Sequence, residues 1–224
     1  SLGLVGSEMC IRDSNRGVDF EELKWLQPGL SWSPDSKKIV FAAKAGKGDV
    51  LHVVEVETGK GEKYELDIEG VFSASWSPLG NEIAYVGQSG NSSDIYIFDL
   101  NSQISKKITN DIFSDAYPTW SGDGKNIAFV SDRGDKISGE YDGFMYEHDY
   151  SQTDIYSVNV ETKKIDRVTN TNHNESHPVW SKTSDNIFYT SDHNGVWNLY
   201  RHPLSGREDS EPIPVTNVLT GLQQ

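Results

Sequence analysis

The sequence contains little cysteine, little basic charge and no long apolar run. Its 224 residues include one cysteine, Cys10, a usage that is compatible with an oxidising compartment. Lys and Arg number 20 against 34 Asp and Glu, which gives a net charge of −14 and argues against a nucleic-acid or anionic-membrane surface, since both need clustered cations. No stretch approaches the roughly 18 apolar residues of a membrane span. We therefore expect no direct membrane insertion of this segment.

Motifs that carry catalytic chemistry are also missing. The sequence has no G-x-S-x-G nucleophile elbow, no glycine-rich phosphate loop and no Cys/His metal spacing. The segment HNESH, residues 173–177, resembles the zinc-protease motif H-E-x-x-H, but its glutamate is two residues after the first histidine. That motif also needs a helix, whereas we interpret this segment as a solvated loop. We predict no catalytic residue, no cofactor and no metal.

The first residues are expected not to belong to the natural protein. The segment LVGSEMCIRD, residues 4–13, resembles the direct translation of a sequencing adapter. We therefore exclude 1–14 from the fold and expect a fragment of environmental (metagenomic) origin that is part of a larger, multidomain chain.

What the sequence does contain is a repeat centred on tryptophan. Trp32, Trp76, Trp120 and Trp180 lie 44, 44 and 60 residues apart. Each is followed by a turn rich in Ser, Pro, Asp or Gly, and then by an alternating strand such as NIAFVS (126–131) and a third strand such as DIYSVNV (154–160). A short closing strand is predicted in KKITN (106–110), DRVTN (166–170) and IPVTN (213–217). The alternation predicts half-buried strands.

Four strands per unit at this period are typical of a propeller blade. We predict an all-β fold, a partial β-propeller of about four four-stranded antiparallel blades, in which the tryptophans, the turns and Asp-Ile-Tyr are architectural. The predicted blades are 27–68, 71–112, 115–170 and 174–217. Residues 15–26 are expected to end a preceding blade, and 218–224 to begin a truncated next one.

The pattern W-S-P-D-x-K-K-I-V-F, followed by D-I-Y and a closing I-T-N, resembles the TolB-type, WD-like β-propeller repeat of bacterial envelope proteins. The sequence departs from it at Leu79, at SKTS (181–184) and at Trp197-Asn198. The resemblance implies a periplasmic or cell-surface location and a domain that docks envelope partners.

An insertion of sixteen residues accounts for the longer third unit. The distance from Trp to the third strand is 18 residues in the second and fourth units but 34 in the third, which places the insertion within 134–153. Long insertions in compact folds are often functional. This one mixes acidic and aromatic residues, so it could pack on its own propeller, contact a partner or bind calcium, although its acids lack the spacing of a calcium loop.

Strand direction predicts where the insertion lies. Antiparallel strands alternate, so connections between second and third strands emerge at the same end as the crossings between blades, and the turns after the tryptophans emerge at the other end. Loops on a rigid scaffold are where binding residues concentrate. The candidate partner-binding residues at the crossing end are Phe113, Asp115, Tyr117, Tyr141, Asp142, Tyr146, His148, Asn174, Glu175 and His177.

We predict a non-catalytic scaffold, not an enzyme, that binds a protein, a peptide or a glycan in the cell envelope. One alternative is the substrate-gating propeller of a serine peptidase similar to prolyl oligopeptidases and dipeptidyl peptidases, with the catalytic domain elsewhere in a longer chain. A second is a structural spacer in a long surface protein.

Overall fold

The computed structural model describes residues 30–45, 48–136, 149–182, 185–204 and 212–219. These residues form strands, turns and loops, and none of them lies in a helix. Within this part of the chain, no helix with the length and apolar character of a membrane span occurs.

The described residues form sixteen strands in four antiparallel sheets, one on each repeat unit. The first sheet contains β1 (Ser31–Trp32), β2 (Lys38–Ala45), β3 (Gly48–Glu55) and β4 (Gly61–Glu65). The second contains β5 (Gly70–Trp76), β6 (Glu82–Ser89), β7 (Ser92–Asp99) and β8 (Ile104–Lys107). The third contains β9 (Asp115–Trp120), β10 (Asn126–Ser131), β11 (Asp154–Asn159) and β12 (Ile165–Arg167). The fourth contains β13 (Glu175–Trp180), β14 (Asn186–Ser191), β15 (Asn198–Pro203) and β16 (Ile213–Pro214).

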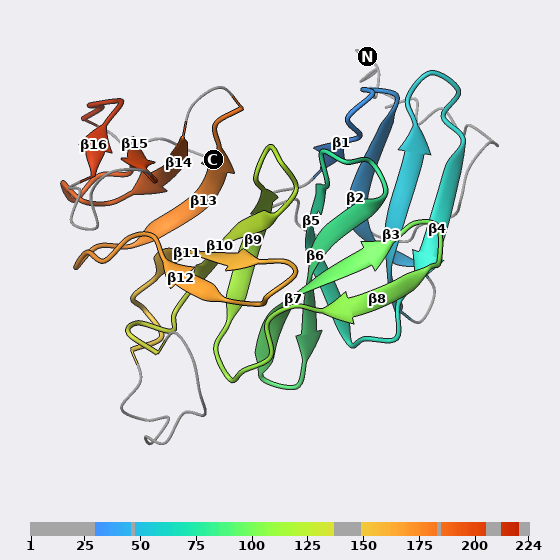
Figure 1. Ribbon diagram of the computed structural model, residues 1–224, viewed down its shortest axis with the longest axis horizontal. Coiled ribbons are helices and arrows are strands. Elements are labelled where there is room, and N and C mark those ends of the chain that lie inside the picture. Colours follow the sequence, from blue (N-terminus) through green and yellow to red (C-terminus); the bar gives the residue numbers. More distant parts are fainter. Residues whose placement is uncertain (1–29, 46–47, 137–148, 183–184, 205–211, 220–224) are drawn as a thin grey trace, which may run out of the picture.

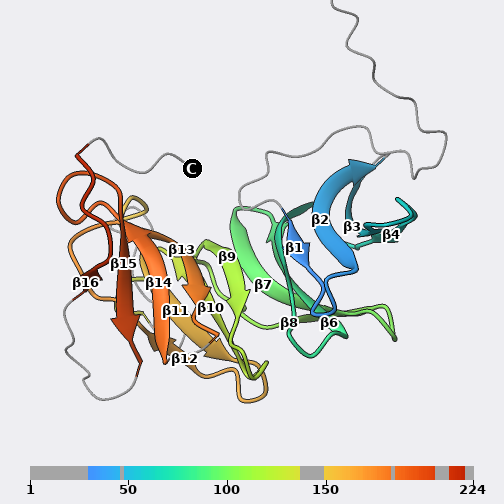
Figure 2. The same cartoon turned by 90° about the horizontal axis from the view of Figure 1, so that it is seen from above.

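In each sheet the strands lie in chain order, and the four sheets follow one another side by side (Figures 1 and 2). The first strands are neighbours, because β1 contacts β5, β5 contacts β9 and β9 contacts β13. The first strands therefore form the inner edge of the assembly. This arrangement of four-stranded blades confirms the predicted all-β partial propeller.

Apolar side chains fill the three spaces between neighbouring sheets. Leu51 of the first sheet shares a core cluster with Ile83 of the second. The second sheet meets the third through Ile97 and Trp120 in the next cluster, and the third meets the fourth in a cluster that contains Tyr189. Each sheet thus obtains its core from its neighbours, as expected of stacked repeats.

The prediction of half-buried strands is wrong for the second strands of the middle sheets. In β10, every residue from Ile127 to Ser131 is buried. In β14, by contrast, Ile187 and Tyr189 are buried while Phe188 and Thr190 are partly exposed. The physical reason is that β10 lies between two neighbouring sheets and β14 packs against one in the part of the chain that is described.

Trp120 and Trp180 are architectural. The indole nitrogen of Trp120 donates a hydrogen bond to the carbonyl of Ser75, 3.0 Å away, and that of Trp180 donates to Thr119 at the same distance. Each bond joins one inner strand to the preceding one. In the turn that follows, the Ser121 hydroxyl donates to Asp123 at 2.7 Å and Gly124 adopts a φ of 70°, which favours glycine.

The closing Thr-Asn pairs lie outside the fourth strands, which corrects the predicted boundaries. β8 ends at Lys107 and β12 at Arg167, so Thr109 and Thr169 follow them. Thr109 Oγ1 accepts a hydrogen bond from the Ile95 backbone, and Thr169 Oγ1 accepts one from Ile155, both at 2.8 Å. The hydrogen bond to each threonine side chain therefore holds the crossing against the third strand of the same blade.

Candidate binding surface

The crossings and the described ends of the insertion meet at one end of the sheets. We call this region the crossing surface and define it by the crossings 108–114 and 168–174 and the connections 132–136, 149–153 and 192–197. The Gln152 amide donates to the His173 carbonyl at 2.6 Å, and the Thr153 backbone donates to Asn174 Oδ1 at 3.0 Å. The described ends of the insertion thus lie beside a crossing, in agreement with the prediction from strand direction.

Two aspartates of the second-to-third-strand connections hold the crossings in place. The Asp132 carboxylate accepts a hydrogen bond from the Ser114 backbone at 2.9 Å, and Asp192 accepts one from the Asn174 backbone at 2.9 Å. These residues were not predicted. The signal for them is the dipeptide Ser-Asp, which ends the second strand of the last two units at 131–132 and 191–192.

Asp115 and Phe113 belong to a buried cluster around Arg133, another residue that was not predicted. The Arg133 guanidinium is 1% exposed and lies 2.6 Å from Asp115 and 2.9 Å from Asp111. It also lies over the rings of Phe113 and Phe129 at 5.7 and 5.3 Å. Burial raises the pKa of Asp115 to about 6, against the opposing effect of Arg133, so its carboxylate is ionised at neutral pH.

Glu175 occupies the same repeat position as Asp115, five residues before the tryptophan, but the described arginines that form ion pairs, Arg133 and Arg167, pair with aspartates. Its carboxyl group accepts hydrogen bonds from Thr171 at 2.6 Å and from Thr169 at 3.0 Å. Burial, together with the nearby carboxylate of Asp154, raises the pKa of Glu175 to about 8. The carboxyl group is therefore largely protonated at neutral pH.

Burial corrects the role predicted for three of the candidate residues. Asp115 and Glu175 are 0% exposed and Phe113 is 3% exposed. Their side chains are enclosed between the crossings and the sheets. The HNESH segment is accordingly not a solvated loop throughout, since β13 begins at Glu175. Asn174 is partly exposed and accepts the bond from Thr153. Tyr141, Asp142, Tyr146 and His148 lie outside the described residues.

Tyr117 and His177 form an aromatic pair at the inner edge. Their rings are stacked with centroids 4.1 Å apart, although they come from neighbouring sheets. Each residue lies in a bulge of its inner strand, with φ of 55° and 52° respectively. Bulky side chains seldom adopt this left-handed conformation, and such outliers cluster at functional sites. Both side chains remain partly exposed.

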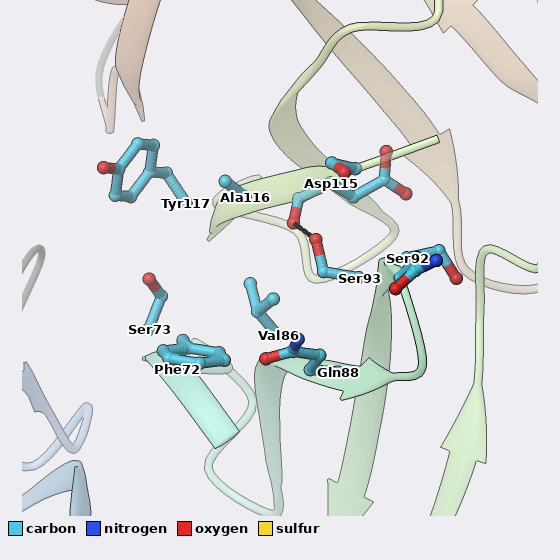
Figure 3. Close-up of a pocket in the computed structure, with 11 residues that line it drawn as sticks. Phe72, Ser73, Val86, Gln88, Ser92, Ser93, Asp115, Ala116 and Tyr117 are labelled. Carbon is cyan, nitrogen blue, oxygen red and sulfur yellow. Dashed lines mark hydrogen bonds between the residues drawn. The ribbon is translucent and has the colours of Figure 1, made fainter. Parts of the chain in front are cut away.

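A pocket of about 420 Å³ lies next to Tyr117, between the second and third sheets. In Figure 3, Asp115, Ala116 and Tyr117 of β9 lie on one side of it, and Phe72, Val86 and Gln88 of β5 and β6 lie on the other. Ser93 closes one end, where its hydroxyl donates to the Asp115 carbonyl at 2.9 Å. In the described ranges, no group of three or more His, Cys, Asp or Glu side chains is arranged to hold a metal.

Radially stacked four-stranded sheets with this strand order define a β-propeller domain. The family model for the TolB β-propeller domain matches residues 22–138, which is more than half of the chain. The chain therefore belongs to the TolB β-propeller family.

Solved structures of the same fold include TolB proteins and a peptidase. TolB from Acinetobacter baumannii is 20% identical with a TM-score of 0.66, and the match covers 84% of this chain and 43% of that one. A TolB structure from Agrobacterium tumefaciens is 20% identical with a TM-score of 0.65, over 86% and 62%. The acylaminoacyl peptidase of Pyrococcus horikoshii is 17% identical with a TM-score of 0.52, over 81% and 31%. The chain thus spans less than two thirds of each structure. No curated protein matches the sequence.

Proposed function

We propose that the chain is a non-catalytic β-propeller scaffold that binds a protein or peptide partner through its crossing surface and the adjoining inner-strand residues Tyr117 and His177. The observation that carries this proposal is the stacked pair of Tyr117 and His177. Left-handed backbone at two bulky residues costs on the order of 1–3 kcal/mol each. The Tyr117 ring packs against the core cluster of the third and fourth sheets, yet both side chains of the pair stay partly exposed. Partly exposed aromatic side chains held on rigid strands suit the anchor of a protein interface.

The proposed location is the bacterial cell envelope, and it rests on membership of the TolB β-propeller family. The ligand class rests on the surface itself. The neighbouring crossing 168–174 carries polar side chains such as Asn174, which is partly exposed, and an aromatic centre with polar neighbours is the usual composition of an interface.

Affinity capture from a bacterial envelope fraction, followed by purification of the captured protein and measurement of its affinity, tests the proposal. We expect the double variant Tyr117→Ser/His177→Ser to lose the partner that the unmodified chain retains. Leu79→Ser is the matched control, because Leu79 is 65% exposed in a turn at the opposite end of the sheets. Equal affinity of the double variant and the control would contradict the proposal.

A second candidate is a propeller that controls substrate access to a serine peptidase. The structural similarity to the acylaminoacyl peptidase favours it. The test is the sequence of the complete gene. A downstream G-x-S-x-G followed by Asp and His would support the peptidase candidate, and its absence from a complete open reading frame would remove it.

A further inference from the structure

The pocket between the second and third sheets offers an unusual set of chemical groups for so acidic a chain. Its lining combines the aromatic rings of Phe72 and Tyr117 with the neutral polar side chains of Gln88, Asn91, Ser92 and Ser114. Its volume of about 420 Å³ is in the range of small-molecule sites, roughly 300–1,000 Å³.

The described lining of the pocket presents no charge to a ligand. Among the described lining residues only Asp115 has a carboxylate, and that carboxylate is ion-paired with Arg133 at 2.6 Å. Figure 3 shows the Asp115 side chain pointing away from Phe72 and Tyr117. The lining residues that the structure describes include no lysine, arginine or histidine. An anionic or cationic ligand would therefore lose its hydration without gaining an opposite charge.

The lining is also unsuited to an added peptide strand. Strand addition needs an open backbone edge, but at the pocket the start of β9 is already occupied. Ser93 forms a bridge with Ser114 and donates its hydroxyl hydrogen to the Asp115 carbonyl. Two residues later, the left-handed bulge at Tyr117 interrupts the regular edge.

We propose that this pocket binds an uncharged saccharide. A sugar ring has an apolar face of C–H groups that stacks on an aromatic ring, here Phe72 or Tyr117, whose π-face is electron-rich. Its hydroxyls both donate and accept hydrogen bonds, and so do the hydroxyl and amide side chains of Ser92, Ser114, Asn91 and Gln88. This ligand is separate from the protein partner of the proposed function, and the two sites share Tyr117.

Isothermal titration calorimetry of the 224-residue chain tests the proposal. The probes are maltotriose, cellotriose and N,N′-diacetylchitobiose, with trigalacturonate as the charged counterpart. We expect at least one neutral probe to bind at millimolar or lower concentration and trigalacturonate not to bind. Absence of binding by all three neutral probes, or equal binding of trigalacturonate, would overturn the proposal.

Variants locate the binding to this pocket. Phe72→Ala removes an aromatic wall and Gln88→Leu removes a hydrogen-bonding group at similar size, and each should weaken binding roughly tenfold. Tyr150→Ala is the control, because Tyr150 is 58% exposed and does not line the pocket. Thermal melts check that all three variants are folded. Unchanged affinity in both pocket variants would refute the assignment, as would binding of a tripeptide with a central tyrosine where no saccharide binds.

Discussion

Asp115 and Glu175 show how one repeat position acquires two different electrostatic roles. Arg133 follows the second strand of the third sheet and pairs with Asp115. The corresponding residue of the fourth sheet is His193, which packs edge-on against His173 with ring centroids 4.5 Å apart. Glu175 is therefore stabilised by hydroxyl groups, without a guanidinium, and its neutral form is favoured.

We predict that Glu175 makes stability depend on pH. Its pKa in the folded chain is about 8, above the ordinary value of 4.5, so between these values the folded state holds a proton that the unfolded state releases. The free energy of unfolding that this residue contributes is fully present below pH 4.5 and falls as pH rises through about 8, by at most about 1.4 kcal/mol per pH unit.

Urea unfolding at several pH values from 5 to 9 measures this effect as a difference between variants. Glu175→Gln should flatten the fall, since the amide stays neutral, while Glu161→Gln, at an exposed position, should leave it unchanged. The comparison between variants removes the contribution of His177 and His202. Burial lowers the pKa of both histidines, so their contribution to the free energy of unfolding rises with pH. Identical slopes for wild type and Glu175→Gln would contradict the prediction.

The sequence predicted where Asp115 and Glu175 lie along the blade, but it did not predict that they are buried. Their place at the crossing end follows from strand direction, which the repeat pattern reveals. Their burial depends on Arg133, Thr169 and Thr171, which approach only when the crossing folds over the blade. A single sequence carries no sign of that approach, so Asp115 and Glu175 were predicted to be surface residues.

At the scale of elements, a hydrogen bond from the third strand to a threonine after the fourth strand recurs in the second, third and fourth sheets. In the fourth sheet, Thr216 Oγ1 accepts from the Leu199 backbone at 2.9 Å, as Thr109 and Thr169 do in the sheets before it. Asn198 takes the place of the usual aspartate and accepts from the Val218 backbone at 2.8 Å. The departure from Asp-Ile-Tyr at this position therefore preserves the contact.

Replacing Thr169 by valine should destabilise the chain by about 1–3 kcal/mol, because the buried backbone N–H of Ile155 loses its acceptor. Thr169→Ser keeps the hydroxyl and should recover most of that loss. Equilibrium denaturation in urea measures both. If valine and serine were equivalent at this position, the threonine would contribute through packing and not through its hydrogen bond.

The strands were well predicted because alternation and β-branched residues recur in each unit. The closing strands were predicted a few residues too far along the chain. The Ile-Thr-Asn segment has β propensity, but it follows the strand and its threonine accepts a hydrogen bond from the third strand. The bulges at Tyr117 and His177 could not be predicted, since left-handed backbone at an aromatic residue runs against its intrinsic preference. Tertiary contacts along the inner edge outweigh that preference.

At the scale of the whole molecule, the fourth sheet differs from the second and third by one exposed face. Val179 is 57% exposed, and its strand neighbour Phe188 lies opposite it on the same face. In the second and third sheets, the residues at the position of Val179 pair with Ala84 and Ala128 respectively. Both alanines are 0% exposed. The apolar face of β13 and β14 is thus a surface suited to association.

We predict that the 224-residue chain associates in a concentration-dependent way through this face. Val179→Lys and Phe188→Lys should each shift the distribution toward the monomer in sedimentation-velocity experiments. Leu79→Lys, a change of the same kind on an exposed turn, should not. A chain that is monomeric at all concentrations, or variants that associate like wild type, would contradict the prediction.

The position three residues before Trp76, Trp120 and Trp180 combines a left-handed backbone with a variable side chain. Ser73, Tyr117 and His177 all have positive φ, at 32°, 55° and 52°, yet one is a small alcohol, one a phenol and one an imidazole. In all three blades the inner strand pairs with the second strand on both sides of this position, with a register shift between. Evolution can therefore change the chemistry of the inner edge one blade at a time without repacking the sheets. A library randomised at these three positions would sample new binding specificities on an unaltered framework.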